Sequence, residues 1–483
     1  MNNWFDFILF HAQTQPEKPA MVMEDRVVTY RMLKIGIERC ANHIVALNIR
    51  PENPVAILVR NPIRHFTLSL ALYRIGIGSI SLEHSQVGIA DLKVAAVLGD
   101  SDAASLVHPE NRFVEVTDAW FSQDALQRLA LPNGFFQQTQ VCRYSLTSGT
   151  TGAPKIIQHR VEDVGRRVLK FVDLNWRLVL SLPGLSSNFG FTNGCAALTS
   201  GRSLCFADSP FQAIRMIELF SVDLVAASTE QLLALTRVAR KLGAHVRSLR
   251  AIYVAGSSPS RALLEASMLN LCNDIHCKYS TSEVGQVAFA SGRDVLSKPG
   301  LVGHIVPGVE VGIFDQHGSQ CSIGQTGVVK CRRKDSTGRL DTEENSWIDL
   351  GDLGWVAEDG QLHIIGRLTD TGTGTTQVAA NQMLPIYEIE HLLRLEWDTE
   401  DAAAIQVNVG PEAQIWVGIV GNEDITAEKV EAIARRQGIE HAIKLFNLPA
   451  IPRTSSGKIN RVQLKMLIQG RRELAAQAIE EAN

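Results

Sequence analysis

The sequence predicts an α/β fold, with a large N-terminal domain of α/β sheets, a β-rich subdomain and a small α+β C-terminal domain. The chain has 483 residues, and a single hydrophobic core stops growing at roughly 250–300 residues. Short apolar runs alternate with helical patterns along the first two-thirds. After about residue 300, apolar runs alternate with glycine and aspartate turns. We expect a large domain over 1–367 and a small one over 368–483.

The α/β part alternates buried strands with helices. A β-rich run at 55–59 precedes a helical pattern from Pro62 to Ile75. Because strands separated by helices are usually joined by crossovers, these elements indicate mainly parallel sheets with helices on both faces. Similar apolar runs follow at 178–182, 223–227 and 251–254, with helical patterns at 211–220, 229–241 and 259–272.

The last part of the chain has a different pattern of apolar runs and turn residues. The runs 309–314 and 327–331 predict antiparallel strands joined by tight turns. The Thr/Gly-rich stretch 370–376 is typical of a linker or a mobile loop. Beyond it we expect helices at 386–395 and 427–437, strands at 402–409 and 414–420, and a charged amphipathic segment at 461–482.

Composition excludes several classes of protein. The net charge of −4 and the pI of about 6.4 give no general attraction for nucleic acid or for an anionic membrane. The N-terminus lacks a basic segment, and no stretch approaches the ~18 apolar residues of a spanning helix, so we expect no stable membrane anchor. The eight cysteines have no zinc-type spacing, which predicts buried, reduced thiols in a cytoplasmic protein.

Residues 144–155, Tyr-Ser-Leu-Thr-Ser-Gly-Thr-Thr-Gly-Ala-Pro-Lys, are the segment most informative about function. Glycines let backbone N–H groups approach an anion, hydroxyls add donors, and Lys155 adds a mobile positive charge. The spacing of a Walker A loop is absent. The segment therefore predicts a triphosphate-binding loop of another kind, and the alternative is a solvent-exposed Ser/Thr/Gly loop.

The order of residues 147–155 resembles the phosphate loop of adenylate-forming enzymes: acyl- and aryl-CoA synthetases, peptide-synthetase adenylation domains and luciferases. The pattern of that superfamily is Thr/Ser-Ser-Gly-Ser/Thr-Thr-Gly-x-Pro-Lys, and this chain matches every constrained position. The resemblance implies that the loop binds ATP, that Lys155 is also catalytic and that Thr147 lies near Mg²⁺. The implied ATP-binding residues of the loop are Thr147, Ser148, Gly149, Thr150, Thr151, Gly152 and Lys155.

Other motifs of the superfamily follow in its order. Residues 279–283, Tyr-Ser-Thr-Ser-Glu, resemble Tyr-Gly-x-Thr-Glu. This resemblance implies that Tyr279 stacks on adenine, Ser282 holds phosphate and Glu283 coordinates Mg²⁺, roles that suit an aromatic face and a hard carboxylate ligand. Taken alone, the segment is equally typical of a helix N-cap. Gly256 and Ser257 occupy the place of the superfamily's glycine-rich segment beside the adenine.

Two further segments complete the expected nucleotide site. Residues 347–352 resemble Tyr-x-Thr-Gly-Asp, which implies that Asp352 accepts hydrogen bonds from the ribose hydroxyls. Gly366-Arg367 matches the Gly-Arg that ends the superfamily's large domain, and Arg367 is expected at the ribose or phosphate. Residues 452–461 resemble Pro-Arg-Thr-x-Ser-Gly-Lys-x-x-Arg, whose lysine, here Lys458, is mobile and catalytic in these enzymes.

These residues imply a mechanism. The acid's carboxylate attacks the α-phosphate of ATP and expels pyrophosphate, so the site must supply positive charge for two anions. Lys458 is expected to bridge the carboxylate and the α-phosphate, and Lys155 to hold the outer phosphates. No general base is needed, because the acid is already ionised at neutral pH.

Departures from the motifs bear on the acid and the acceptor. Residues 189–191, Phe-Gly-Phe, lack the aspartate that binds the ammonium of an α-amino acid, and 183–186 lack the histidine of many CoA-using members. Ser186, Asn188, Phe189 and Phe191 are candidates for the acyl pocket. After Arg367, Thr369 stands at the usual hinge position, and 379–385 differ from the Gly-x-x-Val/Ile-x-Pro-x-Glu of CoA-using members, which weakens CoA use without excluding it.

The sequence therefore predicts an acid–thiol ligase that uses ATP and Mg²⁺ to activate a fatty or aryl acid and transfers it to CoA. One alternative is an enzyme that loads the phosphopantetheine arm of an acyl carrier protein, or one that forms an amide. An alternative of another class is a catalytically inactive nucleotide-binding protein. The presence of Lys155, Glu283, Asp352, Arg367 and Lys458 argues against that last alternative.

Overall fold

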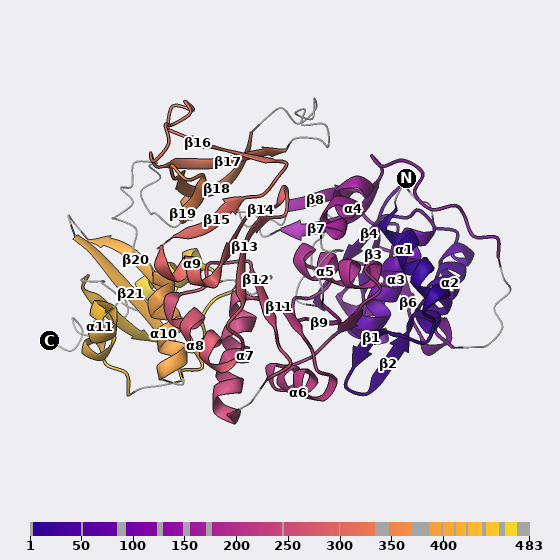
Figure 1. Ribbon diagram of the computed structural model, residues 1–483, viewed down its shortest axis with the longest axis horizontal. Coiled ribbons are helices and arrows are strands. Elements are labelled where there is room, and N and C mark those ends of the chain that lie inside the picture. The colour runs from indigo at the N-terminus through magenta and orange to yellow at the C-terminus, as the bar shows by residue number, and fades with distance from the viewer. Residues whose placement is uncertain are drawn as a thin grey trace. The chain divides into compact units, whose positions relative to one another are not determined.

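The computed structural model confirms a mixed α/β fold (Figure 1). No helix in the described part of the chain is long and apolar enough to cross a membrane. All eight cysteines are free thiols, and only Cys321 is not fully buried. The described residues are 3–49, 52–84, 93–122, 129–147, 155–170, 176–243, 246–298, 300–333, 347–368, 386–397, 399–409, 412–421, 424–436, 441–453 and 459–470.

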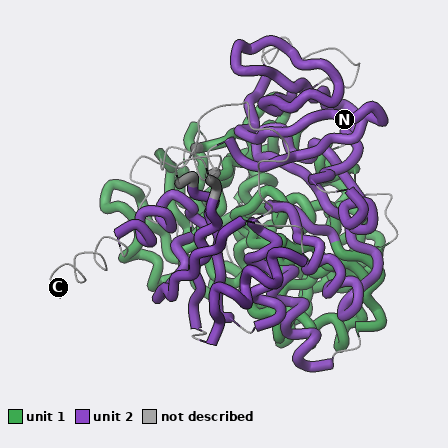
Figure 2. Tube along the Cα trace, turned by 90° about the vertical axis from the view of Figure 1, so that its left-hand side faces the viewer, with its two compact units in different colours: residues 1–231, 244–252 green, residues 232–243, 253–483 purple. Residues whose placement is uncertain are grey.

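The chain divides into two compact units, which Figure 2 colours separately. Unit 1 comprises residues 1–231 and 244–252, and unit 2 comprises 232–243 and 253–483. The boundary that the sequence predicts at 367/368 falls beside residues 369–385, which lie outside the described residues. The two-domain division at that point stays a prediction.

Unit 1 contains a six-stranded sheet in the order β6-β5-β3-β4-β7-β8. All neighbouring strands pair in parallel except β7 and β8, which form an antiparallel hairpin. The residues of β3 and β5 are all buried, as expected for central parallel strands covered on both faces. The strands are β3 (Val55–Leu58), β4 (Ser79–Ser81), β5 (Ala96–Gly99), β6 (Phe113–Glu115), β7 (Val141–Thr147) and β8 (Lys155–Arg160).

Unit 1 also contains the strand order β11-β9-β10-β1-β2, parallel except for the hairpin β1–β2. Five of its helices, α1, α2, α3, α5 and α6, begin after an Asn, Thr or Ser whose side chain accepts a backbone N–H of the first turn. The strands are β1 (Pro19–Met23), β2 (Arg26–Thr29), β9 (Leu178–Ser181), β10 (Ser203–Cys205) and β11 (Leu224–Ser228). The helices are α1 (Trp4–Thr14), α2 (Tyr30–Ala46), α3 (Pro62–Arg74), α4 (Val161–Leu169), α5 (Asn188–Thr199) and α6 (Pro210–Phe220).

Unit 2 carries the β-rich part, in which strands β13 to β19 follow the order β16-β17-β18-β19-β15-β14-β13. The strand pairs among them are antiparallel. The antiparallel strands begin at β13, which is earlier in the chain than the change in sequence pattern near residue 300 predicts. The strands are β13 (Ile275–Thr281), β14 (Gly285–Ser291), β15 (Leu301–Ile305), β16 (Val309–Phe314), β17 (Gly327–Arg333), β18 (Ile348–Val356) and β19 (Gln361–Arg367).

Other elements flank this sheet in the sequence. Two boundaries between the units fall within elements of secondary structure. The boundary at 252/253 lies in the strand β12 (Ala251–Ala255), and the boundary at 231/232 lies in the helix α7 (Thr229–Leu242). Two helices of unit 2, α8 (Arg261–Asn270) and α9 (Gly292–Ser297), lie on either side of β13 and β14 in the chain.

The C-terminal part of unit 2 has its own three-stranded sheet, β20-β21-β22. Helices α10 and α11 pack with buried residues of these strands in one hydrophobic cluster that includes Ile389, Val417 and Val430. The small α+β arrangement predicted for this part of the chain is therefore present (Figure 1). The elements are α10 (Ile386–Glu396), β20 (Asp401–Val409), β21 (Glu412–Val420), α11 (Ala427–Arg436), β22 (Ile443–Asn447) and a helix over 461–470.

Candidate functional site

The predicted phosphate loop connects the two strands of the β7–β8 hairpin. The backbone of Thr147 pairs with that of Lys155, so the hairpin brings the two ends of the loop together. Residues 148–154 lie outside the described residues, as do the side chains of Thr147 and Lys155. The predicted roles of Ser148, Gly149, Thr150, Thr151 and Gly152 therefore stay predictions.

In unit 2, the structure brings together three predicted nucleotide-binding residues. Tyr279 of β13 donates its hydroxyl to Oδ2 of Asp352 on β18. Arg367 of β19, the register partner of Asp352, places its Nε 3.0 Å from Oδ1. The side chain of Asp352 is 5% exposed and that of Arg367 is 47% exposed, so a half-exposed basic residue pairs with a buried acidic one. Nη1 of Arg367 also donates to the carbonyl of Leu350 at 2.8 Å, which fixes the guanidinium.

The electrostatics of this group are coupled. Burial raises the pKa of Tyr279, and the neighbouring negative charge of Asp352 raises it further. Tyr279 is therefore a neutral phenol that can donate a hydrogen bond at physiological pH. The arrangement joins a flat aromatic ring, an oriented carboxylate and a cation, which suits a nucleoside carrying phosphate.

The remaining predicted residues of this region lie at turns. Gly256 follows β12 with a φ of 105°, in the region that favours glycine, and Ser257 beside it is exposed. Ser282 and Glu283 are partly buried in the turn between β13 and β14. The hydroxyl of Thr281 accepts the N–H of Val284 at 3.1 Å and so closes this turn. The segment is a β-hairpin turn, which contradicts the alternative of a helix N-cap.

The segment that carries Lys458 is anchored on both sides. Residues 454–458 lie outside the described residues, but the backbones of Arg453 and Ile459 form a β-bridge across them. Arg453 pairs with both oxygens of Asp401 at 2.7–3.0 Å. Arg461 pairs with Glu390 at 2.6 Å and donates to the carbonyl of Ala404 at 2.6 Å. The motif's two arginines therefore position the two ends of residues 454–458, which we call the lysine loop.

The candidates for the acyl pocket lie around α5 in unit 1. Asn188, the first residue of α5, approaches Oγ of Ser145 at 3.2 Å and Nε2 of His159 at 3.1 Å. Phe191 is buried and lies against the guanidinium of Arg143, whose Cζ is 3.7 Å from the ring centroid. Ser186 instead donates to the carboxylate of Glu83, and Phe189 is partly buried on α5.

Sequence reasoning missed the polar cluster formed by Arg143, Ser145 and His159. Arg143 and His159 are register partners on β7 and β8, and Ser145 follows on the same face of β7. Oγ of Ser145 and Nε2 of His159 are 2.8 Å apart. The signal in the sequence is Val141-Cys142-Arg143-Tyr144-Ser145-Leu146, where polar residues alternate with apolar ones directly before the phosphate loop.

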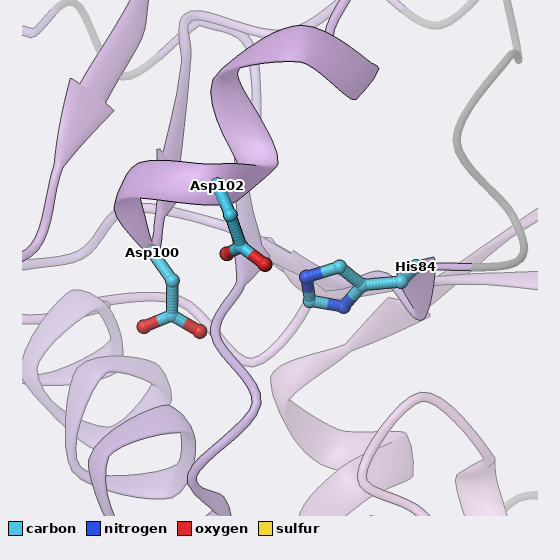
Figure 3. Close-up of side chains that lie close together, drawn as sticks. All are labelled: His84, Asp100 and Asp102. Atoms are coloured by element: carbon cyan, nitrogen blue, oxygen red, sulfur yellow. The ribbon is translucent and has the colours of Figure 1, made fainter.

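A second cluster consists of His84, Asp100 and Asp102, which are residue types that can bind a metal ion (Figure 3). Its candidate ligand atoms lie within 4.8 Å of one another. However, Asp102 forms an ion pair with the guanidinium of Arg60, and Asp100 accepts the backbone N–H of Arg60 at 2.7 Å. We interpret the group as a surface network centred on Arg60.

Comparisons with known proteins identify the family to which the sequence is similar. A family model described as AMP-binding enzyme matches residues 10–337. A fatty acid–[acyl-carrier-protein] ligase of Streptomyces coeruleorubidus is 26% identical, with 94% of each chain aligned.

Solved structures show the same fold. O-succinylbenzoate coenzyme A synthetase of Bacillus subtilis, in complex with AMP, superimposes with a TM-score of 0.78 at 20% identity, covering 96% of this chain and 98% of that one. The amide bond synthetase McbA of Marinactinospora thermotolerans has a TM-score of 0.75 at 21% identity, covering 96% and 99%.

Proposed function

The chain belongs to the AMP-binding enzyme family and is an adenylate-forming acid–thiol ligase, and we propose that it activates a fatty or aryl acid and transfers it to the thiol of CoA. The observation that carries this proposal is the buried carboxylate of Asp352, held between the hydroxyl of Tyr279 and the guanidinium of Arg367. A pre-oriented carboxylate beside an aromatic ring is suited to a ribose and its adenine.

In the first step, a carboxylate oxygen of the acid attacks the α-phosphorus of ATP. The new bond joins oxygen to phosphorus, the bond from the α-phosphorus to the bridging oxygen breaks, and pyrophosphate leaves with its electron pair. Lys458 and Lys155 are proposed to offset the negative charge that accumulates as the two anions meet. Glu283 and Thr147 are the proposed ligands of Mg²⁺, which would neutralise phosphate charge when bound.

In the second step, the thiol sulfur bonds to the acyl carbon and the bond from that carbon to the phosphate oxygen breaks. AMP leaves with the electron pair, and the thiol proton passes to solvent. We propose that residues 368–483 move as one small domain, which would withdraw Lys458 and admit the thiol. The ion pairs Arg453–Asp401 and Arg461–Glu390 support this proposal, because they fix the ends of the lysine loop to the C-terminal sheet and to α10. The loop would then move with its domain.

The similar proteins are named for different acceptors. One relative is named for transfer to an acyl carrier protein, and one structural neighbour is named an amide bond synthetase. Carrier-protein loading through a phosphopantetheine arm therefore stays the first alternative, and amide formation the second. On the sequence grounds given above, we also propose a cytoplasmic location.

A product assay tests the proposal. The enzyme would be incubated with ATP, Mg²⁺ and a panel of fatty and aryl acids, together with CoA, a holo acyl carrier protein or a primary amine. We expect AMP and acyl-CoA in equal amounts, measured by mass spectrometry. Acylated carrier or amide without acyl-CoA would replace the proposed acceptor. Formation of no product with any acid, despite binding of ATP, would instead favour an inactive nucleotide-binding protein.

A further inference from the structure

We propose that the acid bound by this chain carries a second carboxylate at the end remote from the reacting one, and that Arg143 pairs with that second group. The inference rests on the proposed function, since it assigns the class of acid that the ligase activates. It concerns the polar cluster of Arg143, Ser145 and His159 in unit 1, together with Asn188 of α5, which contacts it.

Arg143 is a buried cation for which the described residues provide no carboxylate. Only 1% of the surface of Arg143 is exposed to solvent. Nη1 donates to Oγ of Ser81 at 3.3 Å, Nη2 donates to the carbonyl of Leu185, and Nε has no hydrogen-bond partner. A guanidinium has five N–H donors and retains its charge in proteins. A buried charge that lacks its partner is strongly destabilising, which makes an anionic ligand the natural complement.

The surroundings of Arg143 add positive charge. Nη1 of Arg167 lies 3.3 Å from Nδ1 of His159, the register partner of Arg143. Burial, followed by the charges of Arg167 and Arg143, lowers the pKa of His159 to about 2, so its imidazole is neutral. Burial and the charge of Arg167 lower the pKa of Arg143 to about 10, which leaves it charged at neutral pH. The cluster therefore combines two guanidinium groups around a neutral histidine.

The position of Arg143 indicates the acid as the source of the anion. Its guanidinium lies against the ring of Phe191, and Asn188 on the same helix contacts Ser145 and His159. Both α5 residues are candidates for the acyl pocket. By contrast, Arg143 precedes Thr147 by four residues of an extended strand, roughly 13 Å. The phosphates of ATP would therefore lie at the other end of β7.

A purely structural role for Arg143 makes a different prediction. If the residue served only to hold the carbonyl of Leu185, its charge would be irrelevant to the choice of acid. Acids that differ only in the charge of the remote group would then be used alike. The ratio of their kcat/KM values separates the two roles in the unmodified enzyme, so the test does not depend on a variant that folds.

The first experiment compares dicarboxylic acids with their monomethyl esters in acid-dependent exchange of pyrophosphate into ATP. Linear diacids of about four to ten carbons and the three benzenedicarboxylic acids would cover aliphatic and aryl frames. We expect at least one diacid to exceed its own monoester by tenfold or more in kcat/KM. Exchange with monoesters or simple acids that equals or exceeds exchange with every diacid would overturn the inference and leave the proposed function intact.

The second experiment uses Arg143→Gln with Arg112→Gln as its matched control. Arg112 is an exposed arginine of unit 1 that also donates to a carbonyl, that of Leu47 at 2.9 Å. We expect Arg143→Gln to reduce the diacid-to-monoester ratio at least tenfold, with the KM for ATP unchanged, and Arg143→Lys to restore part of it. A ratio that Arg143→Gln leaves unaltered would contradict the pairing. Loss of exchange with every acid in the unmodified enzyme would instead refute the proposed function.

Discussion

Asp352 is the residue whose environment most directly supports nucleotide binding. Its buried carboxylate accepts a hydrogen bond from Tyr279 and pairs with Arg367. Asp352→Asn keeps the shape but removes the charge, so it should weaken both the pairing with Arg367 and the acceptance of ribose hydroxyls. We expect the Kd for AMP, measured by titration calorimetry, to rise at least tenfold, since hydrogen bonds to charged groups contribute about 1.5–3 kcal/mol.

Asp359→Asn is the matched control for this prediction. Asp359 lies in the same part of unit 2, is half exposed and pairs with Lys298 at 3.2 Å. An ion pair between exposed side chains contributes little to stability, so AMP binding should be unchanged in this variant. Equal AMP affinities for Asp352→Asn and the unmodified protein would remove the basis for placing the ribose at Asp352.

Lys278, the neighbour of Tyr279, is expected to control the pH dependence of stability. Burial lowers its pKa to about 7, and Nζ lies 4.0 Å from the centroid of the Tyr253 ring. In the unfolded chain the pKa returns to its ordinary value of 10.5. Between these two values the unfolded chain binds more protons, so the free energy of unfolding rises with pH across that window.

Lys278→Met should therefore stabilise the protein at about pH 7, by up to roughly 4 kcal/mol, and flatten the rise in stability towards higher pH. Urea denaturation at about pH 7 and about pH 9 measures both effects. Lys298→Met, which alters a lysine that is 46% exposed, serves as control. A lower midpoint at both pH values for Lys278→Met would show that the buried amine is stabilising.

The motifs predicted which residues come together in unit 2 better than they predicted the surroundings of each residue. Tyr279, Asp352 and Arg367 come together although the chain separates them by up to 88 residues (367 − 279). The anchors Asp401 and Glu390 were not predicted, because the spacing in the sequence does not indicate which carboxylate an arginine will reach. Arg143 was missed for a related reason, since a charge inside a strand normally indicates an exposed face.

At the scale of elements, the hydrogen bonds between α10 and the N-terminus of α8 give a testable prediction about local stability. Both carboxylate oxygens of Glu388 on α10 accept the backbone N–H of Arg261, the first residue of α8, at 2.8 and 3.0 Å. Nδ1 of His391, one turn later, accepts the N–H of Ser260 at 3.3 Å. A carboxylate at a helix N-terminus is favoured by the unpaired N–H groups and by the helix dipole. The contact should hold the C-terminal sheet against α8.

Glu388→Ala should loosen this contact without unfolding either helix. Loss of about 1–2 kcal/mol corresponds to a rise of fivefold to thirtyfold in opening, which amide hydrogen exchange over 261–264 and 386–396 would detect. Glu396→Ala changes an exposed glutamate at the other end of α10 and should leave exchange unaltered. Equal exchange in the two variants would show that the carboxylate does not hold α10 to α8.

The strands and helices that were predicted correctly are those with a clear apolar run or apolar helical pattern in the sequence. The strands β3, β9, β11 and β12 lie within a few residues of their predicted bounds, as do the helices α3, α6, α7 and α8. The helices α4 and α5 were not predicted. The hairpins β7–β8 and β13–β14 were not predicted as such. Both contain buried charged residues, Arg143 and Lys278, which interrupt the apolar pattern from which strands are predicted.

At the scale of the whole molecule, the order of the motifs predicted the adenylate-forming fold, and both the family match and the solved structures agree with it. The acid could not be predicted in the same way. The pocket that we propose depends on the contacts of α5 with the β7–β8 hairpin, and the sequence does not indicate which side chains of these elements meet. The cluster around Arg143 became visible only in the folded chain.

The central claim is that this chain forms an acyl-adenylate, and acid-dependent exchange of labelled pyrophosphate into ATP tests it most directly. We expect exchange with at least one fatty, aryl or dicarboxylic acid, no exchange without acid, and a loss of more than a hundredfold in Lys458→Ala, since one lost electrostatic contact to a transition state typically costs about 10²–10³ in rate. Absence of exchange with every acid, or exchange that Lys458→Ala leaves intact, would contradict the account.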